Sequence, residues 1–336
     1  MTPLEAFHAA VTACDPTVRV AAVAPRAEVG IAIGKAALAM ARGAKGERGI
    51  IVSPVDGHVP GWTTIVSSHP FPDARSVEAG RAVRALVESA DDSILALISG
   101  GASSLIEEPL IPLDDFVARV RAAMNAGATI HELNALRTSL SGIKGGKLVA
   151  SCKARVTTLV ASDVFGDALD VVGSGPTVRS RPGDVTELVL PMRAFAEAMR
   201  DVLKLPLVDA PYTCRVEVVA SVLVGPCIAW GEPTLDIPDD HGEGGRAQQL
   251  ALELARRGRT ALVIGTDGID GPPPANRPAP AGAMVDAATW DAIRAAGIDP
   301  ERALARRDAG TALAAVGALV VTGPTGVNHA DVCVLT

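Results

Sequence analysis

Short apolar runs alternate with stretches of helical periodicity along this chain of 336 residues, and this alternation limits the folds open to it. Residues 29–33 and 94–98 are apolar runs of strand length, and residues 155–161 are interpreted as a further strand. The apolar side chains of residues 79–90 recur at the spacing of one helix face. Strand, helix and strand in regular succession predict parallel sheets joined by crossover helices. Ligands bind at the carboxyl edge of such sheets, so the polar residues that follow each strand are the functional candidates.

The length of the chain predicts two domains. The proline-bounded segment 206–211 has the weakest pattern, and we place a boundary near Tyr212, which gives domains 1–212 and 213–336. Beyond it we expect strands at 216–224, 227–229, 261–264 and 319–321, helices at 248–257 and 285–296, and a proline-rich loop at 271–280. The predicted fold class is α/β, with two domains whose largely parallel or mixed sheets are flanked by helices.

Composition and charge narrow the class of protein. Aromatic residues are only 3% of the chain and the formal net charge is −7, so a nucleic-acid partner is not expected. Five cysteines without a C-x-x-C pair predict free thiols in a reducing compartment. The N-terminus lacks a signal-peptide pattern, and no run reaches the roughly 18 apolar residues of a membrane helix. We therefore expect a cytoplasmic protein without a membrane partner.

The segment ISGGASSL, residues 98–105, follows an expected strand and opens an expected helix. Glycines let a backbone approach a ligand closely, and a turn into a helix directs N–H groups at one point, which suits phosphate oxygens. Strand-to-helix turns of ordinary α/β domains are glycine-rich as well. The segment alone leaves both interpretations open.

Two further segments place a cation beside glycine. Gly34-Lys35 stands at an expected junction of strand and helix, where the lysine is either a phosphate ligand or a solvated charge. Gly244-Gly245-Arg246 is interpreted as a turn that opens a helix and presents Arg246 to an anion. A Walker A motif is absent from the sequence.

Residues 137–148, RTSLSGIKGGKL, combine cations and glycines. Arg137, Ser141 and Lys144 are spaced by four and three residues, so a helix would place them on one side. Such a side is either an anion site or a solvent face, and the glycine pair that follows favours the anion site.

Four acidic residues follow apolar strands: Asp163, Glu232, Asp267 and Asp270. Mg²⁺ bound to nucleotide phosphates needs one or two such carboxylates. Asp-Gly pairs also form ordinary turns, which gives Asp267 and Asp270 an alternative interpretation. The six histidines lack metal-ligand spacing, so no zinc site is expected.

Two other motif interpretations are weak. Gly242-x-Gly244-x-x-Ala247 matches a dinucleotide fingerprint in form, but residues 238–241 break any strand before its first glycine. Ser103 and Ser104 lack a G-x-S-x-G context, which disfavours a serine nucleophile.

Together these segments resemble the glycerate 2-kinase family of the MOFRL type, which is also labelled hydroxypyruvate reductase. The resemblance runs from near residue 30 to the C-terminus and depends on Gly34-Lys35, SSHPFPDARS with His69, ISGGASSL, ATIHELNALRTSLSGIKGGKL, ASDVFGD, GSGPTV, GEPT, GGRAQQLAL, GTDGIDG and VTGPTGVNHADV. It implies transfer of the γ-phosphoryl group of ATP to the 2-hydroxyl of D-glycerate or a close hydroxy acid, with Mg²⁺, in a cleft between two α/β domains. The implied partners are therefore ATP and a small hydroxy acid, and a homodimer is compatible with the family.

The resemblance also implies roles for residues of this chain. Lys35 would hold the transferring phosphoryl group, Arg246 would stabilise its oxygens, and Arg137 would bind the glycerate carboxylate. The implied catalytic residues are Lys35, Arg246 and Asp163, and Asp163, Glu232 and Asp267 are the metal or general-base candidates. The implied substrate and phosphate contacts are Ser99, Gly100, Gly101, Ser103, Ser104, Asn134, Arg137, Lys144, Gly244 and Gly245.

The chain departs from the family pattern at the implied site. Ala247 and Gln249 replace an asparagine and a glutamate of the family's G-G-R-N-Q-E, residues 273–277 differ, and a segment is missing near 219–227. A lost polar contact should cost affinity or change the substrate. Two alternatives therefore stay open: a nicotinamide-dependent hydroxypyruvate reductase, and a relative that has lost activity and acts as a binding protein.

Overall fold

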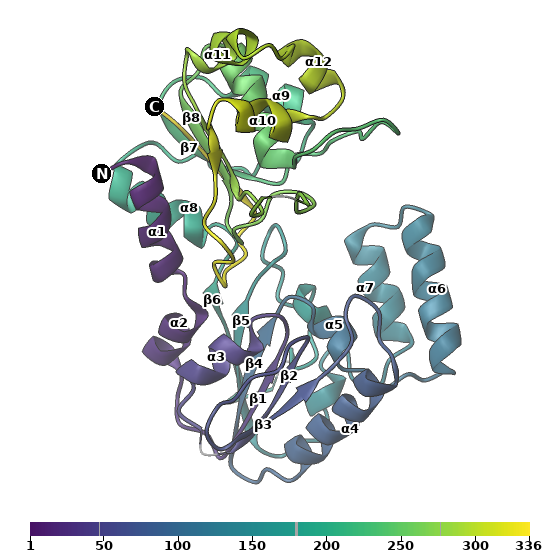
Figure 1. Ribbon diagram of the computed structural model, residues 1–336. Helices are drawn as coiled ribbons and strands as arrows, with labels where there is room; N and C mark the ends of the chain where they lie inside the picture. The colour runs from purple at the N-terminus through teal and green to yellow at the C-terminus, as the bar shows by residue number, and fades with distance from the viewer. Residues whose placement is uncertain (47, 179–180, 276) are drawn as a thin grey trace. The chain divides into compact units, whose positions relative to one another are not determined.

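The computed structural model describes residues 1–46, 48–178, 181–275 and 277–336, which pack into two compact units (Figure 1). One unit is Asp15–Met192, and the other joins Met1–Cys14 to Arg193–Thr336. These units are defined by packing, and the boundary near Tyr212 stays a prediction from the sequence. In the described residues, none of the helices combines the length and apolar character that crossing a membrane requires.

The unit Asp15–Met192 contains a parallel sheet of six strands in the order β3-β2-β1-β4-β5-β6. The strands are β1 (Val29–Ile33), β2 (Gly49–Ser53), β3 (Trp62–Val66), β4 (Ser93–Ser99), β5 (Arg155–Ala161) and β6 (Val185–Leu190). The helices are α2 (Pro16–Val23), α3 (Ala37–Gly43), α4 (Ala74–Glu88), α5 (Ala102–Leu105), α6 (Leu113–Asn125) and α7 (Ile130–Ser139), with 3-10 turns at Lys147–Val149 and Val172–Ser174.

Helices cover both faces of this sheet, which is why its central strands are apolar throughout. Strand β1 is fully buried, and its residues Val29, Ile31 and Ile33 share one core with Ala79 and Val83 of α4. Helix α3 contacts β1, β2 and β4. The strands expected at 29–33 and 155–161 are confirmed at those bounds.

The order of the strands reverses at β1. From β1 the chain adds β2 and β3 on one side, and then crosses to add β4, β5 and β6 on the other. The ligand crevice of such a sheet lies at the carboxyl ends of the two strands where the order reverses, here β1 and β4.

The other unit contains a five-stranded sheet in the order β10-β9-β8-β11-β7, with antiparallel pairs throughout. The strands are β7 (Cys227–Gly231), β8 (Ala261–Gly265), β9 (Gly282–Val285), β10 (Leu319–Val320) and β11 (Asp331–Leu335). The helices are α1 (Pro3–Ala13), α8 (Ala194–Leu203), α9 (Val216–Val222), α10 (Arg246–Arg256), α11 (Thr289–Ala295), α12 (Pro300–Ala305) and α13 (Ala309–Ala315).

The predicted fold class, α/β with parallel or mixed sheets, is confirmed. One expected element of the second unit was wrong, and the helix of another begins later than expected. The strand expected at 216–224 is the helix α9, because Val216, Val219, Ala220 and Leu223 are buried at helical spacing, which overrides the strand preference of valine. The helix expected at 285–296 is the end of β9 followed by α11.

Candidate functional site

The loops after β1 and β4 are bonded to each other at the strand-order reversal. The Lys35 amide donates to the Gly100 carbonyl at 2.8 Å, and the Ala36 amide donates to Ser99 Oγ at 3.1 Å. Gly34 has φ +134°, and a Cβ there would lie 2.1 Å from Ser99 Oγ. Gly34 is thus required for the close approach that brings Lys35 to the Gly100 loop.

The side chain of His69 lies beside these two loops. A Cβ on Gly101 would lie 3.1 Å from His69 Cδ2 and 3.2 Å from Lys35 Cγ, so both side chains flank that glycine. Partial burial, and then the charge of Lys35, lower the pKa of His69 below 6.5, so its ring is neutral near pH 7. His69 belongs to the sequence motif SSHPFPDARS, which by itself predicts no role for this residue.

Asp163 follows β5, the neighbour of β4 in the sheet. A Cβ on Gly100 would lie 1.9 Å from Asp163 Oδ2, so the carboxylate occupies the space that any other residue at position 100 would fill. Lys35, His69 and Asp163 therefore surround Gly100 and Gly101 at the carboxyl edge of the parallel sheet.

The two serines after the glycines are already bonded within the unit. The amide and the Oγ of Ser104 both donate hydrogen bonds to the Gly101 carbonyl, at 3.1 and 3.2 Å. Ser103 Oγ lies 2.9 Å from Ser174 Oγ, which in turn donates to Asn134 Oδ1 at 2.7 Å. Asn134, a predicted substrate contact, is buried, and its Nδ2 donates to the Val171 carbonyl at 3.2 Å, which connects α7 to the 171–174 segment. Ser174 was missed because GSGPTV offers no chemical signal of its own.

The expectation that Arg137, Ser141 and Lys144 share one helix face was wrong, because α7 ends at Ser139. Ser141 Oγ and Lys144 Nζ both donate to Glu107, which is fully buried. Burial lowers the pKa of Lys144, and the charge of Glu107 opposes this shift. Lys144 is 1% exposed in this ion pair, which connects two segments of the chain and leaves little of the side chain accessible to a phosphate.

Arg137 is less buried than Lys144. Its side chain is half-buried, and in the described residues it has no hydrogen bond or ion pair. Burial lowers the pKa of Arg137, and Glu107 again opposes the shift. A half-buried guanidinium without a protein partner is suited to bind a carboxylate.

In the other unit, Arg246 opens helix α10 and lies between two carboxylates. Its Nη1 is 3.1 Å from Glu232 Oε2, and its Nε is 3.4 Å from Asp331 Oδ2. Burial opposes ionisation of Arg246, but Asp331 and Glu232 raise its pKa above the ordinary value. Sequence reasoning missed Asp331, since the first residue of β11 follows no apolar run that would have indicated a strand end.

Asp331 is buried, which raises its pKa to about 8, although the charge of Arg246 acts in the opposite direction. Asp270 is buried too and accepts from the amides of Ala247 and Gln248 at 3.0 and 2.8 Å, so it caps helix α10. Asp267 is exposed, and its Oδ1 accepts from the Ile269 amide at 3.0 Å.

The glycines before α10 are explained by packing. A Cβ on Gly245 would lie 2.2 Å from Asp270 Oδ1, and Gly244 has φ +130°. A Cβ on Gly242 would lie 2.2 Å from Asp308 Cγ. These close approaches are to protein atoms, and the segment before Gly242 is irregular, so the resemblance to a dinucleotide fingerprint gains no support.

The candidate metal ligands among the described residues do not form a complete metal site by themselves. In the described ranges, no group of three or more His, Cys, Asp or Glu side chains is arranged to hold a metal ion. Mg²⁺ on a nucleotide takes only one or two carboxylates and fills its octahedron with water and phosphate oxygens. Asp163 beside the Gly100 loop fits that requirement.

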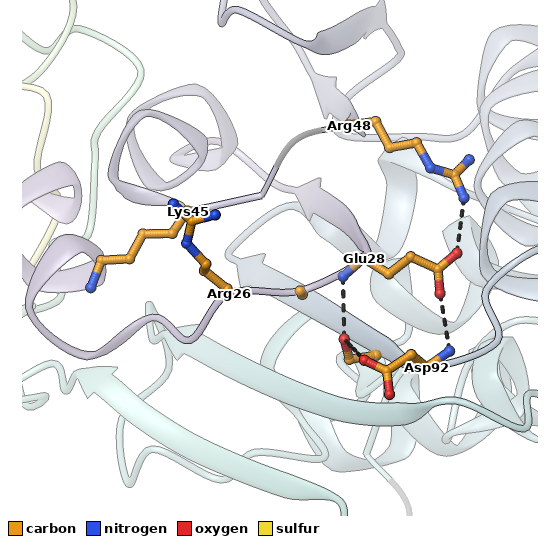
Figure 2. Close-up of a pocket in the computed structure, with 7 residues that line it drawn as sticks. Arg26, Glu28, Lys45, Arg48 and Asp92 are labelled. Atoms are coloured by element: carbon orange, nitrogen blue, oxygen red, sulfur yellow. Dashed lines mark hydrogen bonds and ion pairs between the residues drawn. The ribbon is translucent and has the colours of Figure 1, made fainter.

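A cavity of about 730 Å³ lies away from this site (Figure 2). It is lined by Arg26, Glu28, Lys45, Arg48 and Asp92, at the amino ends of β1, β2 and β4. Glu28 accepts from Arg48 Nη2 at 3.1 Å and from the Asp92 amide at 3.0 Å. This cavity is therefore at the sheet edge opposite to the Gly100 loop.

Comparison with known proteins identifies the protein family of this chain. The profile of DUF4147, described as a domain of unknown function, matches residues 2–204, and that of the MOFRL family matches residues 226–331. The chain belongs to the glycerate kinase family of the MOFRL type, as the sequence motifs indicated. The matches below confirm the predicted enzyme class, a kinase.

Three similar proteins illustrate the match. A D-glycerate 2-kinase of Thermotoga maritima is 30% identical over 376 aligned residues, covering 90% of this chain and 89% of that protein. A putative hydroxypyruvate reductase of Agrobacterium vitis is 34% identical, covering 84% of this chain and 91% of that protein. The crystal structure of glycerate kinase from Thermotoga maritima has a TM-score of 0.88 at 28% identity, covering 99% of this chain and 98% of that one.

Proposed function

We propose that this protein transfers the γ-phosphoryl group of ATP to the 2-hydroxyl of D-glycerate, giving 2-phosphoglycerate. The observation that supports this reaction is the convergence of Lys35, His69 and Asp163 on Gly100 and Gly101 at the strand-order reversal. Phosphoryl transfer depends mainly on positioning and on neutralising charge, and this group of residues supplies a cation, a carboxylate and approachable backbone. The names of the relatives support the same reaction.

In the proposed reaction, the exposed Lys35 ammonium binds the transferring phosphoryl oxygens, while the backbone of Gly100 and Gly101 lets the phosphate chain approach. The neutral ring of His69 can accept a hydrogen bond from the substrate hydroxyl. For Arg246 we propose contact with the transferring group, in competition with Glu232 and Asp331.

Arg137 is the proposed ligand of the glycerate carboxylate, because its half-buried guanidinium has no partner in the described residues and can pair in bidentate fashion. Asp163 is the proposed general base or Mg²⁺ ligand. Mg²⁺ bound there would neutralise charge on the phosphate oxygens. Glu232 and Asp267 remain candidate Mg²⁺ ligands on the basis of the sequence alone.

Two alternatives weighed from the sequence receive no support from the geometry. A nicotinamide reductase needs a pyrophosphate turn, and the glycines of that motif pack against Asp308 and Asp270. A binding protein without turnover was suggested by Ala247 and Gln249. Both are buried in α10, where Gln249 donates to the Leu304 carbonyl at 3.1 Å. Their replacement therefore changes packing of the helix, while Lys35, His69 and Asp163 are retained.

The experiment that tests the proposal is release of ADP by the purified protein with MgATP and a panel of hydroxy acids, including D-glycerate, L-glycerate and tartronate. We expect D-glycerate or a close analogue to give the highest kcat/KM. Oxidation of NADH by hydroxypyruvate, without ADP release from any acid, would instead identify a reductase. Binding of ATP without turnover of any acid would identify a binding protein.

A further inference from the structure

A cavity of about 660 Å³ is lined by residues at the start of α4 and along α6, both within the unit Asp15–Met192. Figure 1 labels these two helices. Its apolar lining includes Phe71, Pro72, Leu113 and Val117. Ligand pockets of this size and mostly apolar lining take a compound of the size of a nucleoside.

An aromatic ring is accessible in this cavity, which is unusual for this chain. Three of the five phenylalanines, Phe7, Phe116 and Phe195, are fully buried, whereas Phe71 is half-exposed. The guanidinium carbon of Arg121 lies 4.6 Å from the centroid of the Phe71 ring. A ring with a stacked guanidinium can hold a further planar, aromatic group.

Two charged groups at the cavity are free to bind a ligand, whereas a third, Asp73, is paired with Arg75. In the part of the chain that the structure describes, Arg121 has no hydrogen bond or ion pair besides its contact with Phe71, and the exposed Asp114 has neither. A carboxylate accepts hydrogen bonds from the ring N–H or amino groups of a base, and a guanidinium donates to ring nitrogens or ribose oxygens.

The cavity is next to the candidate phosphate site along the chain. Ser68 lines the cavity, and His69, the next residue, flanks Gly101 of the phosphate loop. Phe71 follows His69 by two residues, so their Cα atoms are at most about 7 Å apart. A nucleotide that places its terminal phosphates at Gly100 and Gly101 therefore has a base-sized cavity within reach of its other end.

We propose that the cavity lined by α4 and α6 is the subsite for the base of the phosphoryl donor, a purine stacked on Phe71 and Arg121 with Asp114 at its edge. This inference rests on the proposed kinase function, because it assumes that phosphates bind at the Gly100 loop. It assigns nucleotide specificity to residues that take no part in the transfer of the phosphoryl group.

The test measures equilibrium binding by calorimetry of two probes, ADP and inorganic tripolyphosphate, which carries no base. The variants are Phe71→Leu and Arg121→Gln, with Phe71→Trp as a conservative replacement and Arg119→Gln as the matched control. Arg119 is exposed on the same helix but does not line the cavity. Thermal unfolding of each variant checks that it is folded.

Loss of base stacking should weaken ADP about tenfold in Phe71→Leu and in Arg121→Gln. Tripolyphosphate affinity should stay unchanged in both, Phe71→Trp should restore ADP binding, and Arg119→Gln should bind both probes as the wild type does. Wild-type ADP affinity in Phe71→Leu and Arg121→Gln would overturn the inference, and so would an equal loss of both probes.

Failure of the kinase proposal gives a different result. If wild-type protein binds neither probe and releases no ADP with any hydroxy acid, the phosphate site itself is absent and both proposals fail. If it binds tripolyphosphate as tightly as ADP and phosphorylates an acid, the kinase proposal stands and the base subsite is overturned.

Discussion

At the scale of single residues, the proposed function depends on which charged groups are free and which are already paired. Lys35 is exposed beside the Gly100 loop, whereas Lys144 is buried against Glu107. Both lysines were phosphate candidates in the sequence because each stands next to glycine. Only the structure separates them, since the partner of Lys144 lies 37 residues away along the chain.

Removal of the Lys35 ammonium should abolish phosphoryl transfer without unfolding the protein. Lys35→Ala deletes an exposed charge that has no ion-pair partner in the described residues, so stability should change by less than about 0.5 kcal/mol. ADP release with MgATP and D-glycerate is the measurement, and Lys45→Ala at the opposite edge of the sheet is the control. Turnover at the wild-type rate in Lys35→Ala would remove this lysine from the mechanism.

The buried Asp331 predicts a pH dependence of stability. Burial raises the pKa of Asp331 from 3.8 to about 8, so between these values the folded protein retains a proton that the unfolded chain releases. Stability therefore falls as pH rises through this window, and the raised pKa of Asp270 acts in the same direction. Asp331→Asn has no carboxyl to ionise at this position, so its stability relative to wild type should increase from pH 4 to pH 8.

Urea unfolding at pH 5, 7 and 8.5 measures this difference. It is followed through Trp230 or Trp290, which lie in the unit formed by residues 1–14 and 193–336, called the C-terminal unit below. The charged groups near Asp331 are Arg246, Glu232, Asp270 and Asp267. A difference between wild type and Asp331→Asn that does not change with pH would show that Asp331 is ionised in the folded protein throughout the range.

At the scale of elements, the ion pair between Glu107 and Lys144 connects the segment after α5 to the segment after α7. Lys144→Met leaves the Glu107 carboxylate buried with one partner fewer, which should cost roughly 3–5 kcal/mol in the free energy of unfolding. The double variant Glu107→Gln with Lys144→Met removes both charges and should recover part of the loss. Urea unfolding compares the three proteins, and equal stability of wild type and Lys144→Met would contradict the structural role.

Elements were predictable from the sequence where the local pattern matched the packing. The strands expected at 29–33 and 155–161 have the predicted bounds. Helices cover both faces of their sheet, so most residues on both faces of these strands are buried. The valines of 216–224 were misread as a strand, because β-branched residues at helical spacing satisfy both patterns. The antiparallel pairing of the second sheet is set by contacts such as β8 with β11, which are distant in sequence.

The candidate site was only partly predictable for the same reason. Lys35, the Gly100 loop and Asp163 could be proposed from their positions after apolar strands. His69, Ser174 and Asp331 could not, since their roles come from neighbours that the fold brings to them: Gly101, Ser103 and Arg246. Such contacts cannot be predicted from residue type and spacing.

At the scale of the whole molecule, the first fourteen residues of the chain belong to the same unit as residues 193–336. Helix α1 packs against α8, and the Phe7 ring lies 5.2 Å from that of Phe195. Phe7→Ala removes a fully buried ring, so it should destabilise the unit containing residues 193–336 by about 3–5 kcal/mol. Thr12 is exposed on the same helix and provides the control variant Thr12→Ala, which should unfold as the wild type does.

Calorimetry of Phe7→Ala, combined with proteolysis of partly unfolded protein, reports which unit loses stability. We expect a lower melting temperature for the unit that contains α1, with cleavage beyond residue 193, and little change in Asp15–Met192. Cleavage confined to residues 15–192 would contradict the assignment of α1 to the C-terminal unit.

The central claim is that this molecule phosphorylates a 2-hydroxy acid at a site centred on Lys35 and the Gly100 loop. The most direct test is the position of the phosphate in the product, determined by ³¹P NMR after incubation of the purified protein with MgATP and D-glycerate. We expect 2-phosphoglycerate from the wild-type protein and no phosphorylated glycerate from Lys35→Ala. Formation of 3-phosphoglycerate, or of no phosphorylated glycerate by the wild-type protein, would contradict the claim.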